Sequence, residues 1–389
     1  MSERKIKVFL AAGEPSGDLL AARLMRALKK QTKGAVSFSG VGGEAMRAEG
    51  MASLFPISDL SVMGFWEVLP SIPRILRRIR ETVAAVEREK PDIVITVDSW
   101  SFSKQVHLRL QKKGIRIPHI HYVAPQVWAW KEKRARQIKK WVDHLLLLLP
   151  FEEKYFAPYG MAMTYVGHPV IEGGADQGDA ERFLKAHKLS EKDVILTVLP
   201  GSRKTEIKYL LPVFRETVAQ LVKKYPKLRV VIPTVETVKR KVEQETTSWP
   251  VKPVIVTGEK ERYDAFAASR AALSASGTVS LELSMAGVPH LIAYKVSPVS
   301  AWLVRRLIKI KYVNLVNILA DEKIIPELLQ EDCNSTQIML ELEKLMTDEG
   351  RVQQKRAAAV LRQLGAGKKE TPSEKAGEVV RKLIAAHEH

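Results

Sequence analysis

The chain has 389 residues, of which 46% are hydrophobic and 7% aromatic, a composition that suits two globular domains and excludes a disordered or fibrous chain. Its single cysteine, Cys333, excludes an internal disulfide and a metal site built on several thiolates. The formal net charge of +18 favours a polyanionic partner, which is a nucleic acid, an anionic membrane surface or a phosphorylated substrate.

Short apolar runs alternate with amphipathic segments along the first half of the chain. The predicted strands are 6–12, 36–40, 93–97, 119–123 and 144–149, and the predicted helices are 19–30, 104–113 and 131–141. Alternation of this kind predicts a parallel sheet with helices on both faces.

The second half repeats the pattern, with strands predicted at 194–199, 229–233, 254–257, 271–274 and 290–294 and a helix at 211–224. A segment rich in glycine and acidic residues, 171–179, separates the halves. We therefore expect domains at 1–172 and 173–389, with the C-terminal helices free to pack back on the first domain. The expected architecture is α/β, with two doubly wound, Rossmann-like domains facing a cleft and ligand-binding loops at the carboxyl ends of the strands.

Two loops in the first half carry polar side chains directly after predicted strands. Residues 13–18, Gly-Glu-Pro-Ser-Gly-Asp, lack the G-x-G-x-x-G spacing of a dinucleotide site, so they bind a different substrate or serve as a turn with Asp18 as a helix cap. Asp98 follows the strand 93–97. It is a candidate general base for an attacking hydroxyl, or alternatively an Asx turn.

Two loops in the second half suit phosphate. Gly201, Ser202 and Arg203 offer backbone N–H groups, a hydroxyl and a guanidinium to a diphosphate; the alternative is an ordinary turn with an exposed arginine. Residues 274–278 lead into a predicted helix whose free N–H groups attract anions. Glu282, one turn into that helix, is placed to accept from ribose hydroxyls, or is solvated beside an N-cap at Thr278.

Two further segments combine bulky apolar or aromatic residues with basic ones. Residues 121–131 contain Trp128 and Trp130 and precede a basic run, a pattern that suits stacking on bases or sugars or anchoring at a membrane interface. His121 by itself is more typical of a core histidine. Residues 62–80 place apolar side chains among arginines, as in a helix lying at a lipid surface or, alternatively, packed on the core; 302–312 is a second such stretch.

The longest aliphatic run, 145–149, is far shorter than the roughly 20 residues of a spanning helix, and residues 1–7 lack the apolar core of a signal peptide. We therefore expect a cytoplasmic protein. No cluster of metal-ligating residues and no P-loop is evident in the sequence.

Taken together, these segments resemble the lipid-A-disaccharide synthase family over nearly the full chain. Residues 13–18 are similar to its G-E-x-S-G-D motif, 62–69 to V-M-G-x-x-E-V-L, and 121–130 to H-Y-V-x-P-x-V-W-A-W. Residues 147–152, 167–168, 199–203 and 275–278 match its remaining blocks in order and spacing. Pro15 is a departure from the alanine of some members, and residues 99–102 after Asp98 also vary.

The resemblance implies a metal-independent, inverting glycosyltransferase of the GT-B type that needs no cofactor. It would join UDP-2,3-diacylglucosamine to 2,3-diacylglucosamine 1-phosphate (lipid X) and release UDP and a β-1,6-linked disaccharide 1-phosphate. The second half would hold UDP and the first half the acceptor. The enzyme would associate peripherally with the anionic inner face of the inner membrane, without nucleic acid; a homodimer is left open.

The resemblance also implies roles for particular residues of this chain. Asp98 and Arg203 would be catalytic. UDP would be bound by Gly201, Ser202, Arg203, Ser276, Gly277, Thr278, Glu282 and Asn317. The acceptor-side loop would comprise Gly13, Glu14, Ser16, Gly17 and Asp18. The membrane patch would comprise Met63, Phe65, Trp66, Val68, Leu69, Ile72 and Leu76.

Two other classes of protein remain as alternatives. A nucleic-acid-binding protein is favoured by the charge and by the segment with Trp128 and Trp130, but no RNP, KH, zinc-finger or helix-turn-helix pattern supports it. A sugar-nucleotide epimerase shares the two-domain form, but it has no need of a lipid-facing patch.

Overall fold

The computed structural model describes residues 4–60, 65–127, 135–275, 277–296 and 311–387, with the side chains of all but 65–70 and 278 among them. The chain forms two compact units, Met1–Pro169 with Lys368–His389, and Val170–Gly367. The expected boundary after residue 172 lies close to the observed one. The C-terminal helices of the expected second domain, 173–389, had been left free to pack back on the first domain, and Lys368–His389 belongs to the first unit.

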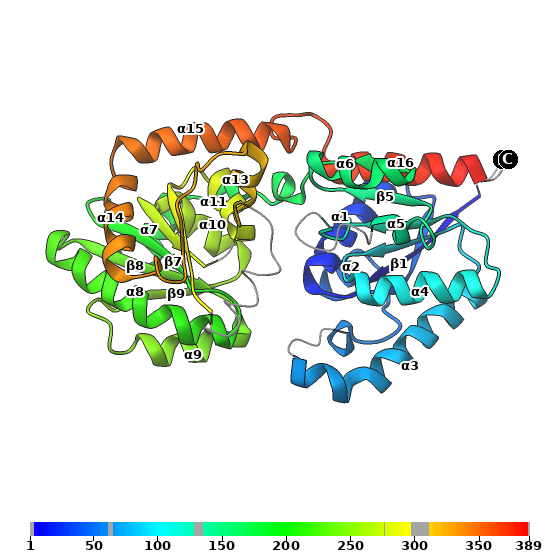
Figure 1. Ribbon diagram of the computed structural model, residues 1–389, viewed down its shortest axis with the longest axis horizontal. Helices are drawn as coiled ribbons and strands as arrows, with labels where there is room; N and C mark the ends of the chain where they lie inside the picture. The colour runs from blue at the N-terminus through cyan, green and yellow to red at the C-terminus, as the bar shows by residue number, and fades with distance from the viewer. Residues whose placement is uncertain (1–3, 61–64, 128–134, 276, 297–310, 388–389) are drawn as a thin grey trace. The chain divides into compact units, whose positions relative to one another are not determined.

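The first unit is built on a parallel six-stranded sheet in the order β2-β1-β3-β4-β5-β6 (Figure 1). Its strands are β1 (Ile6–Ala12), β2 (Val36–Val41), β3 (Ile93–Val97), β4 (His119–Tyr122), β5 (His144–Leu147) and β6 (Met163–Tyr165). The four central strands are almost completely buried. In β1, β3 and β5 most residues are apolar, as expected for a parallel sheet covered on both faces, whereas the buried β4 carries two histidines, His119 and His121.

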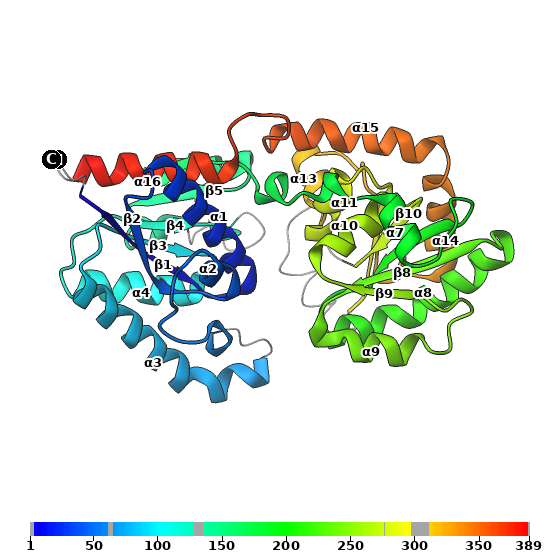
Figure 2. The same cartoon turned by 180° about the vertical axis from the view of Figure 1, so that it is seen from behind.

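Helices cover the two faces of this sheet. The longer ones are α1 (Pro15–Gln31), α3 (Phe65–Glu89), α4 (Trp100–Lys112) and α16 (Pro372–His387), and the short ones are α2 (Glu44–Ala48), α5 (Ala135–Ile138) and α6 (Glu153–Phe156). One core cluster joins α1 and α16 to the sheet, and another joins α3 and α4 to its opposite face (Figures 1 and 2). Ala376, Val380 and Ile384 of α16 are buried in the first cluster, which explains why the C-terminus belongs to this unit.

The second unit has a parallel six-stranded sheet in the order β12-β11-β10-β7-β8-β9. Its strands are β7 (Val194–Leu199), β8 (Leu228–Thr234), β9 (Val254–Thr257), β10 (Ala271–Ser274), β11 (His290–Tyr294) and β12 (Glu327–Leu329). Its helices are α7 (Ala180–Ala186), α8 (Lys204–Lys224), α9 (Glu236–Thr246), α10 (Glu259–Ala268), α11 (Gly277–Met285), α13 (Leu315–Ala320), α14 (Ser335–Leu345) and α15 (Asp348–Gln363). Side chains of α8, α9 and α14 pack on one face of the sheet, and those of α10 and α11 contribute to clusters on the other.

The expected α/β architecture of two Rossmann-like domains is confirmed, and all ten predicted strands are present to within two residues at either end. The sequence did not indicate β6 and β12, which are edge strands of three residues each. Such short strands carry too few side chains for a periodic signal. Of the basic helix expected at 131–141, the described part contains only α5.

Candidate functional site

The order of strands in each sheet changes direction at one point, and the polar loops follow the strands on either side of it. In the first unit this point lies between β1 and β3, because β1 pairs with β2 on one side and with β3 on the other. In the second unit it lies between β7 and β10. Open α/β sheets bind ligands outside the carboxyl ends of their strands at this switch point. The loops at 13–18, 98–99, 201–203 and 275–278 are therefore the candidate site segments.

In the first unit, the loops after β1 and β3 are joined by two hydrogen bonds between side chains. The Ser16 hydroxyl donates to Oδ2 of Asp98 at 3.0 Å, and the Ser99 hydroxyl donates to Oε1 of Glu14 at 3.0 Å. The Ser99 backbone N–H also donates to Oδ1 of Asp98. Four residues from two loops that are 82 residues or more apart in the chain thus form one polar cluster at the switch point.

Asp18 has a different environment from Asp98, although it was grouped with the acceptor-side loop. Its side chain is buried, and its two carboxylate oxygens accept from the backbone N–H groups of Gly43, Ala45 and Met46. Asp18 therefore stabilises the N-terminus of α2 rather than facing a ligand. Asp18 is a helix cap, as the alternative interpretation held, but it caps α2 and not α1, the helix to which Asp18 belongs.

Two buried histidines, His107 on α4 and His121 on β4, lie close to β3, the strand that precedes Asp98. The Thr96 hydroxyl, on β3, lies 2.8 Å from Nε2 of His107 and 2.8 Å from Nδ1 of His121. Burial lowers the pKa of His121 to about 3 and the pKa of His107 well below its ordinary value. Both rings are therefore neutral, and His121 is a core residue, as the sequence suggested. It also packs against Trp100 at a ring-centroid distance of 4.8 Å.

In the second unit, the loop after β7 is held by a residue that the sequence analysis did not identify. Glu206, in the first turn of α8, accepts from the backbone N–H groups of Ser202 and Arg203 and from the Arg203 guanidinium at 3.1 Å. Tyr294 donates a long hydrogen bond, 3.4 Å, to the same carboxylate. The donors predicted to bind a diphosphate are therefore occupied by an internal carboxylate. The sequence signal for this contact is the position of Glu206 three residues after Arg203, which is the spacing of a capping box.

The loop after β10 leads directly into α11, which begins at Gly277. The backbone of Thr278 lies inside the first turn, so the alternative that Thr278 is the N-cap was wrong; Ser276 and the Thr278 side chain lie outside the described residues. Glu282 is partly buried and pairs with the Arg262 guanidinium at 3.3 Å. A ribose contact by Glu282 would therefore share this carboxylate with Arg262.

Asn317 was expected to contact UDP. It is fully buried, and its amide donates to the backbone oxygen of Ile325 and to Glu327 while its oxygen accepts from the backbone N–H groups of Ile324 and Ile325. These four hydrogen bonds use the donors and acceptors that an asparagine side chain has. Asn317 therefore fixes the segment before β12, and its contact with UDP stays a prediction.

The structure describes only part of the proposed membrane patch. Met63 and the side chains of Phe65, Trp66, Val68 and Leu69 lie outside the described residues, as do Trp128, Trp130 and most of 302–312. On α3, which begins at Phe65, Ile72 and Leu76 are 41% and 39% exposed. Ile79, which the sequence pattern placed on the same apolar face, is 1% exposed and packs in the core with Val83 and Val86.

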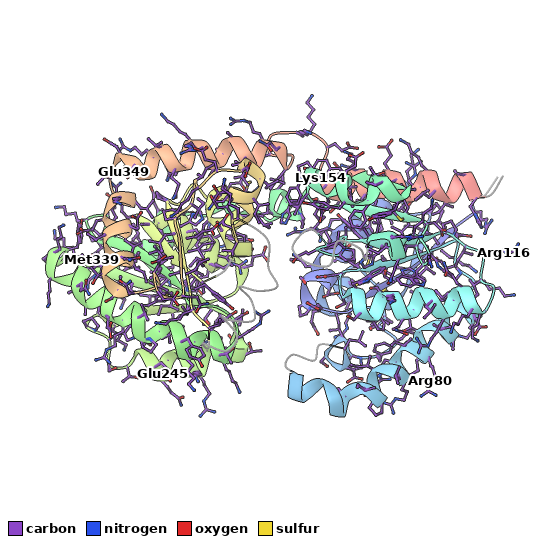
Figure 3. All side chains as sticks on the ribbon, viewed as in Figure 1. Arg80, Arg116, Lys154, Glu245, Met339 and Glu349 are labelled. Carbon is purple, nitrogen blue, oxygen red and sulfur yellow. The ribbon has the colours of Figure 1, made fainter. Side chains whose placement is uncertain are left out.

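The arginines of α3 also separate into two groups. Arg74, Arg77 and Arg80 are exposed, and Figure 3 shows Arg80 projecting from the helix. Arg78, by contrast, forms ion pairs with Asp59 and Glu81 and lies over the Phe55 ring. The carboxyls of Asp59 and Glu81 raise the pKa of Arg78. Arg78 therefore attaches α3 to the rest of the unit and is not a lipid-facing residue.

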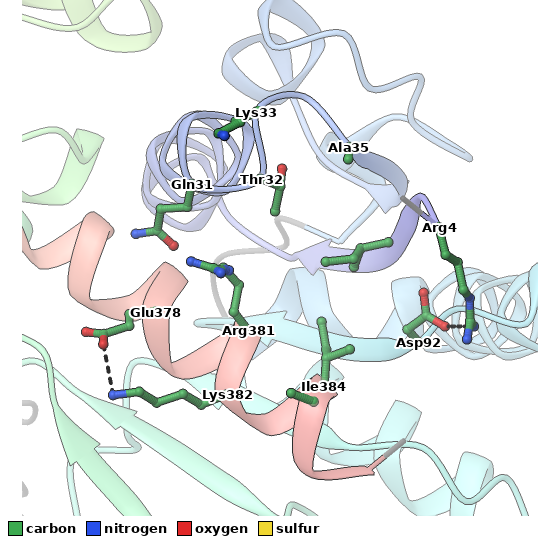
Figure 4. Close-up of a pocket in the computed structure, with 12 residues that line it drawn as sticks. Arg4, Gln31, Thr32, Lys33, Ala35, Asp92, Glu378, Arg381, Lys382 and Ile384 are labelled. Atoms are coloured by element: carbon green, nitrogen blue, oxygen red, sulfur yellow. Dashed lines mark hydrogen bonds and ion pairs between the residues drawn. The ribbon is translucent and has the colours of Figure 1, made fainter. Parts of the chain in front are cut away.

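One cavity, of about 990 Å³, lies away from these loops. It is lined by Ile6 at the start of β1, by the end of α1 and by α16 (Figure 4). Two ion pairs, Arg4 with Asp92 and Lys382 with Glu378, lie in the wall of this cavity. Since β1 begins at Ile6 and the polar loop follows its other end, this cavity is at the opposite edge of the sheet from Asp98.

No group of three or more histidine, cysteine, aspartate or glutamate side chains among the described residues is arranged to hold a metal ion. No helix within the described ranges has the length and apolarity needed to cross a membrane.

The fold and the switch-point loops define a two-domain protein of the class that contains GT-B glycosyltransferases and sugar-nucleotide epimerases. The UDP-GlcNAc 2-epimerase from Neisseria meningitidis, solved with UDP-GlcNAc bound, has a TM-score of 0.64 at 13% identity, covering 98% of this chain and 100% of its own. The calicheamicin glycosyltransferase CalG4 has a TM-score of 0.63 at 13% identity, covering 99% of both chains. At this identity the likeness concerns the fold alone.

The sequence comparisons identify the family within that class. Residues 8–382 match the family described as Lipid-A-disaccharide synthetase. Lipid-A-disaccharide synthases of Rhodospirillum centenum and Paramagnetospirillum magneticum are 48% and 49% identical to this chain, over 98% and 96% of it and 95% and 96% of their own lengths. The chain belongs to the lipid-A-disaccharide synthase family and is a glycosyltransferase of lipid A disaccharide synthesis. The epimerase alternative is thereby set aside.

Proposed function

We propose that the enzyme transfers 2,3-diacylglucosamine from its UDP derivative to the 6-hydroxyl of 2,3-diacylglucosamine 1-phosphate, with Asp98 as the general base. The cluster of Ser16, Glu14, Asp98 and Ser99 at the first switch point is the observation that carries this assignment. Asp98 keeps lone pairs that its two neighbours do not use, whereas both oxygens of buried Asp18 are taken up by the backbone.

In the proposed reaction, Asp98 accepts the proton of the acceptor 6-hydroxyl as that oxygen attacks the anomeric carbon of the donor. The new bond joins the oxygen to the anomeric carbon, and the bond from this carbon to the diphosphate oxygen breaks. UDP leaves with the electron pair, and the configuration at the carbon is inverted. The proton on Asp98 then passes to solvent.

The second unit is proposed to hold the leaving UDP. Arg203 and the backbone N–H groups of Ser202 and Arg203 would bind the diphosphate as its charge increases, with the first turn of α11 as a second source of N–H groups. Since Glu206 occupies these donors in the absence of substrate, donor binding exchanges one anion for another at the start of α8. The arrangement supplies positive charge without a metal ion.

We further propose that the enzyme acts at an anionic membrane surface on the cytoplasmic side. Its substrates carry acyl chains, and α3 presents exposed apolar side chains at Ile72 and Leu76 beside the exposed Arg74, Arg77 and Arg80. Such a helix lies at the headgroup boundary with its arginines on anionic lipid.

The test is to incubate the purified protein with both lipid substrates in mixed micelles and to follow UDP release and the disaccharide 1-phosphate by mass spectrometry. We expect product at equal rates with and without EDTA. Activity that is lost in EDTA and restored by magnesium or manganese would refute metal independence. Absence of disaccharide under both conditions, with UDP bound normally, would refute the proposed substrates.

A further inference from the structure

We propose that Ser16 is a positioning residue for Asp98, and that its hydroxyl holds the carboxylate oriented for proton acceptance. This inference rests on the proposed role of Asp98 as general base. It adds that the loop after β1 acts through a specific hydrogen bond, from Ser16 Oγ to Asp98 Oδ2 at 3.0 Å, and not only by contacting the acceptor.

The backbone at Asp98 is unusual and needs support. Asp98 and Ser99 both adopt left-handed conformations, with φ of 56° and 43°. A non-glycine residue in this region is strained and persists only where its surroundings fix it, often at functional sites. Here the Asp98 N–H donates to the Tyr122 carbonyl, and the Ser103 hydroxyl donates to the Asp98 carbonyl. The main chain of Asp98 is thus held by β4 and α4.

The carboxylate itself is held by a second set of contacts. Oδ1 accepts from the Ser99 backbone N–H at 2.8 Å, and Oδ2 accepts from Ser16. Among the described residues, Ser16 supplies the side-chain donor to this carboxylate. One hydrogen bond to each oxygen fixes the plane of the carboxylate and leaves other lone pairs for the substrate hydroxyl.

Close approach of the two loops makes this contact possible. A Cβ atom on Gly13 would lie 2.5 Å from the Ser99 Cβ, and one on Gly17 would lie 3.1 Å from the Val97 carbonyl oxygen. The two glycines therefore allow the loop after β1 to lie directly against the turn at 98–99, which brings the Ser16 hydroxyl within reach of Asp98.

The two carboxylates of the cluster have separate side-chain donors. The Ser99 hydroxyl donates to Glu14, whereas the Ser16 hydroxyl donates to Asp98. Ser16 therefore holds the Asp98 carboxylate independently of Glu14, in the orientation that a general base requires.

The experiment compares kcat and the KM of each substrate in variants of the enzyme. Ser16→Ala should lower kcat about tenfold with the donor KM unchanged, since the carboxylate is no longer fixed in orientation. Ser16→Thr keeps a hydroxyl at the same place and should restore the parental kcat.

Ser99→Ala is the matched control. It removes the other 3.0 Å hydrogen bond between the same two loops, but it leaves the Ser99 N–H on Asp98 and the Ser16 hydroxyl in place. The kcat of Ser99→Ala should therefore fall less than that of Ser16→Ala. Melting temperatures of all variants report any general loosening of the loops.

A parental kcat in Ser16→Ala would overturn the inference, and so would equal losses of kcat in Ser16→Ala and Ser99→Ala, because the effect would then come from the loop as a whole. If Ser16→Ala unfolds, Ser16→Cys decides in its place, since a thiol is a weak donor and should also lower kcat. Asp98→Asn separates the two hypotheses. Full activity in that variant refutes the general base, whereas an inactive Asp98→Asn with a fully active Ser16→Ala refutes only the role of Ser16.

Discussion

Asp18, in the first turn of α1, and Asp98, directly after β3, lie at the same edge of one sheet, and their surroundings give them different functions. Asp18 is buried with three backbone donors, whereas Asp98 is only partly buried and has one side-chain donor and one backbone donor. Replacing each carboxylate by its amide therefore affects different properties of the enzyme.

We predict that Asp98→Asn lowers kcat by roughly 10²–10⁴-fold, because an amide cannot accept the proton, while UDP binding and melting temperature stay close to those of the parent. Asp18→Asn should instead destabilise the first unit by roughly 1–3 kcal/mol, because an amide group replaces one acceptor among buried N–H donors. Steady-state kinetics, UDP titration and thermal unfolding of the two variants check this. An active Asp98→Asn enzyme would direct attention to Glu14.

Arg203 is the corresponding residue of the second unit. Arg203→Ala should lower kcat by roughly 10²-fold, or about 3 kcal/mol, because the guanidinium no longer stabilises the leaving diphosphate. Folding should change little, since the ion pair with Glu206 is largely solvent-exposed on the arginine side. The control is Arg215→Ala, an exposed arginine on the same helix, α8. Equal turnover in both variants would remove Arg203 from the mechanism.

At the scale of elements, α3 combines an exposed apolar surface with a buried one. We predict that Ile72→Ser with Leu76→Ser releases the protein from anionic vesicles and leaves its melting temperature nearly unchanged, because both side chains are well exposed. Ile79→Ser should do the reverse. It should lower stability by roughly 3 kcal/mol or more through a polar group and a cavity in the core, with vesicle binding retained in the folded protein.

Vesicle co-sedimentation and thermal unfolding of the same preparations distinguish these outcomes. If the double variant melts early and still binds vesicles, Ile72 and Leu76 belong to the core and the membrane proposal for α3 fails. The exposed Arg74, Arg77 and Arg80 add an electrostatic contribution to membrane binding, about 1 kcal/mol each at an anionic surface. Salt weakens this contribution.

At the scale of the whole molecule, buried histidines make stability depend on pH. Burial lowers the pKa of His121 to about 3 and the pKa values of His168 and His290 to about 4. In the unfolded chain these groups titrate near 6.5, so below that pH the unfolded state binds protons that the folded state does not. Stability is therefore greatest above pH 6.5 and falls as the pH decreases towards 4.

For a group that shifts from 6.5 to about 4, the loss at pH 5 is roughly 2 kcal/mol relative to neutral pH. Denaturant unfolding at pH 7, 6 and 5 checks the direction. His290→Gln should reduce the pH dependence of the second unit, since glutamine does not titrate. A stability that is independent of pH between 7 and 5 in the parent protein would contradict the prediction.

The sequence by itself determined the elements and the class of protein. The strands are short apolar runs whose ends are marked by proline, glycine or charged residues, so β1, β3, β7 and β10 were predicted to the residue. Parallel strands also place the following loops at one edge, so the loops at 13–18, 98, 201–203 and 275–278 could be named as candidate segments before the fold was known. These are local properties of the chain, which periodicity and turn residues express directly.

Only the tertiary structure decided which of those residues meet and which are occupied elsewhere. The order of strands places β1 beside β3, so Ser16 reaches Asp98 across 82 residues of chain. Contacts between distant parts of the chain have the same effect elsewhere. Asp18 of α1 caps α2, and the apolar side chains of α16 attach this helix to the first unit. The side-chain amide of Asn317 similarly donates to the Ile325 carbonyl and to Glu327, beside and within β12. Hydrogen-bond partners and burial depend on which surfaces pack together, and a pattern of residue types does not contain that information.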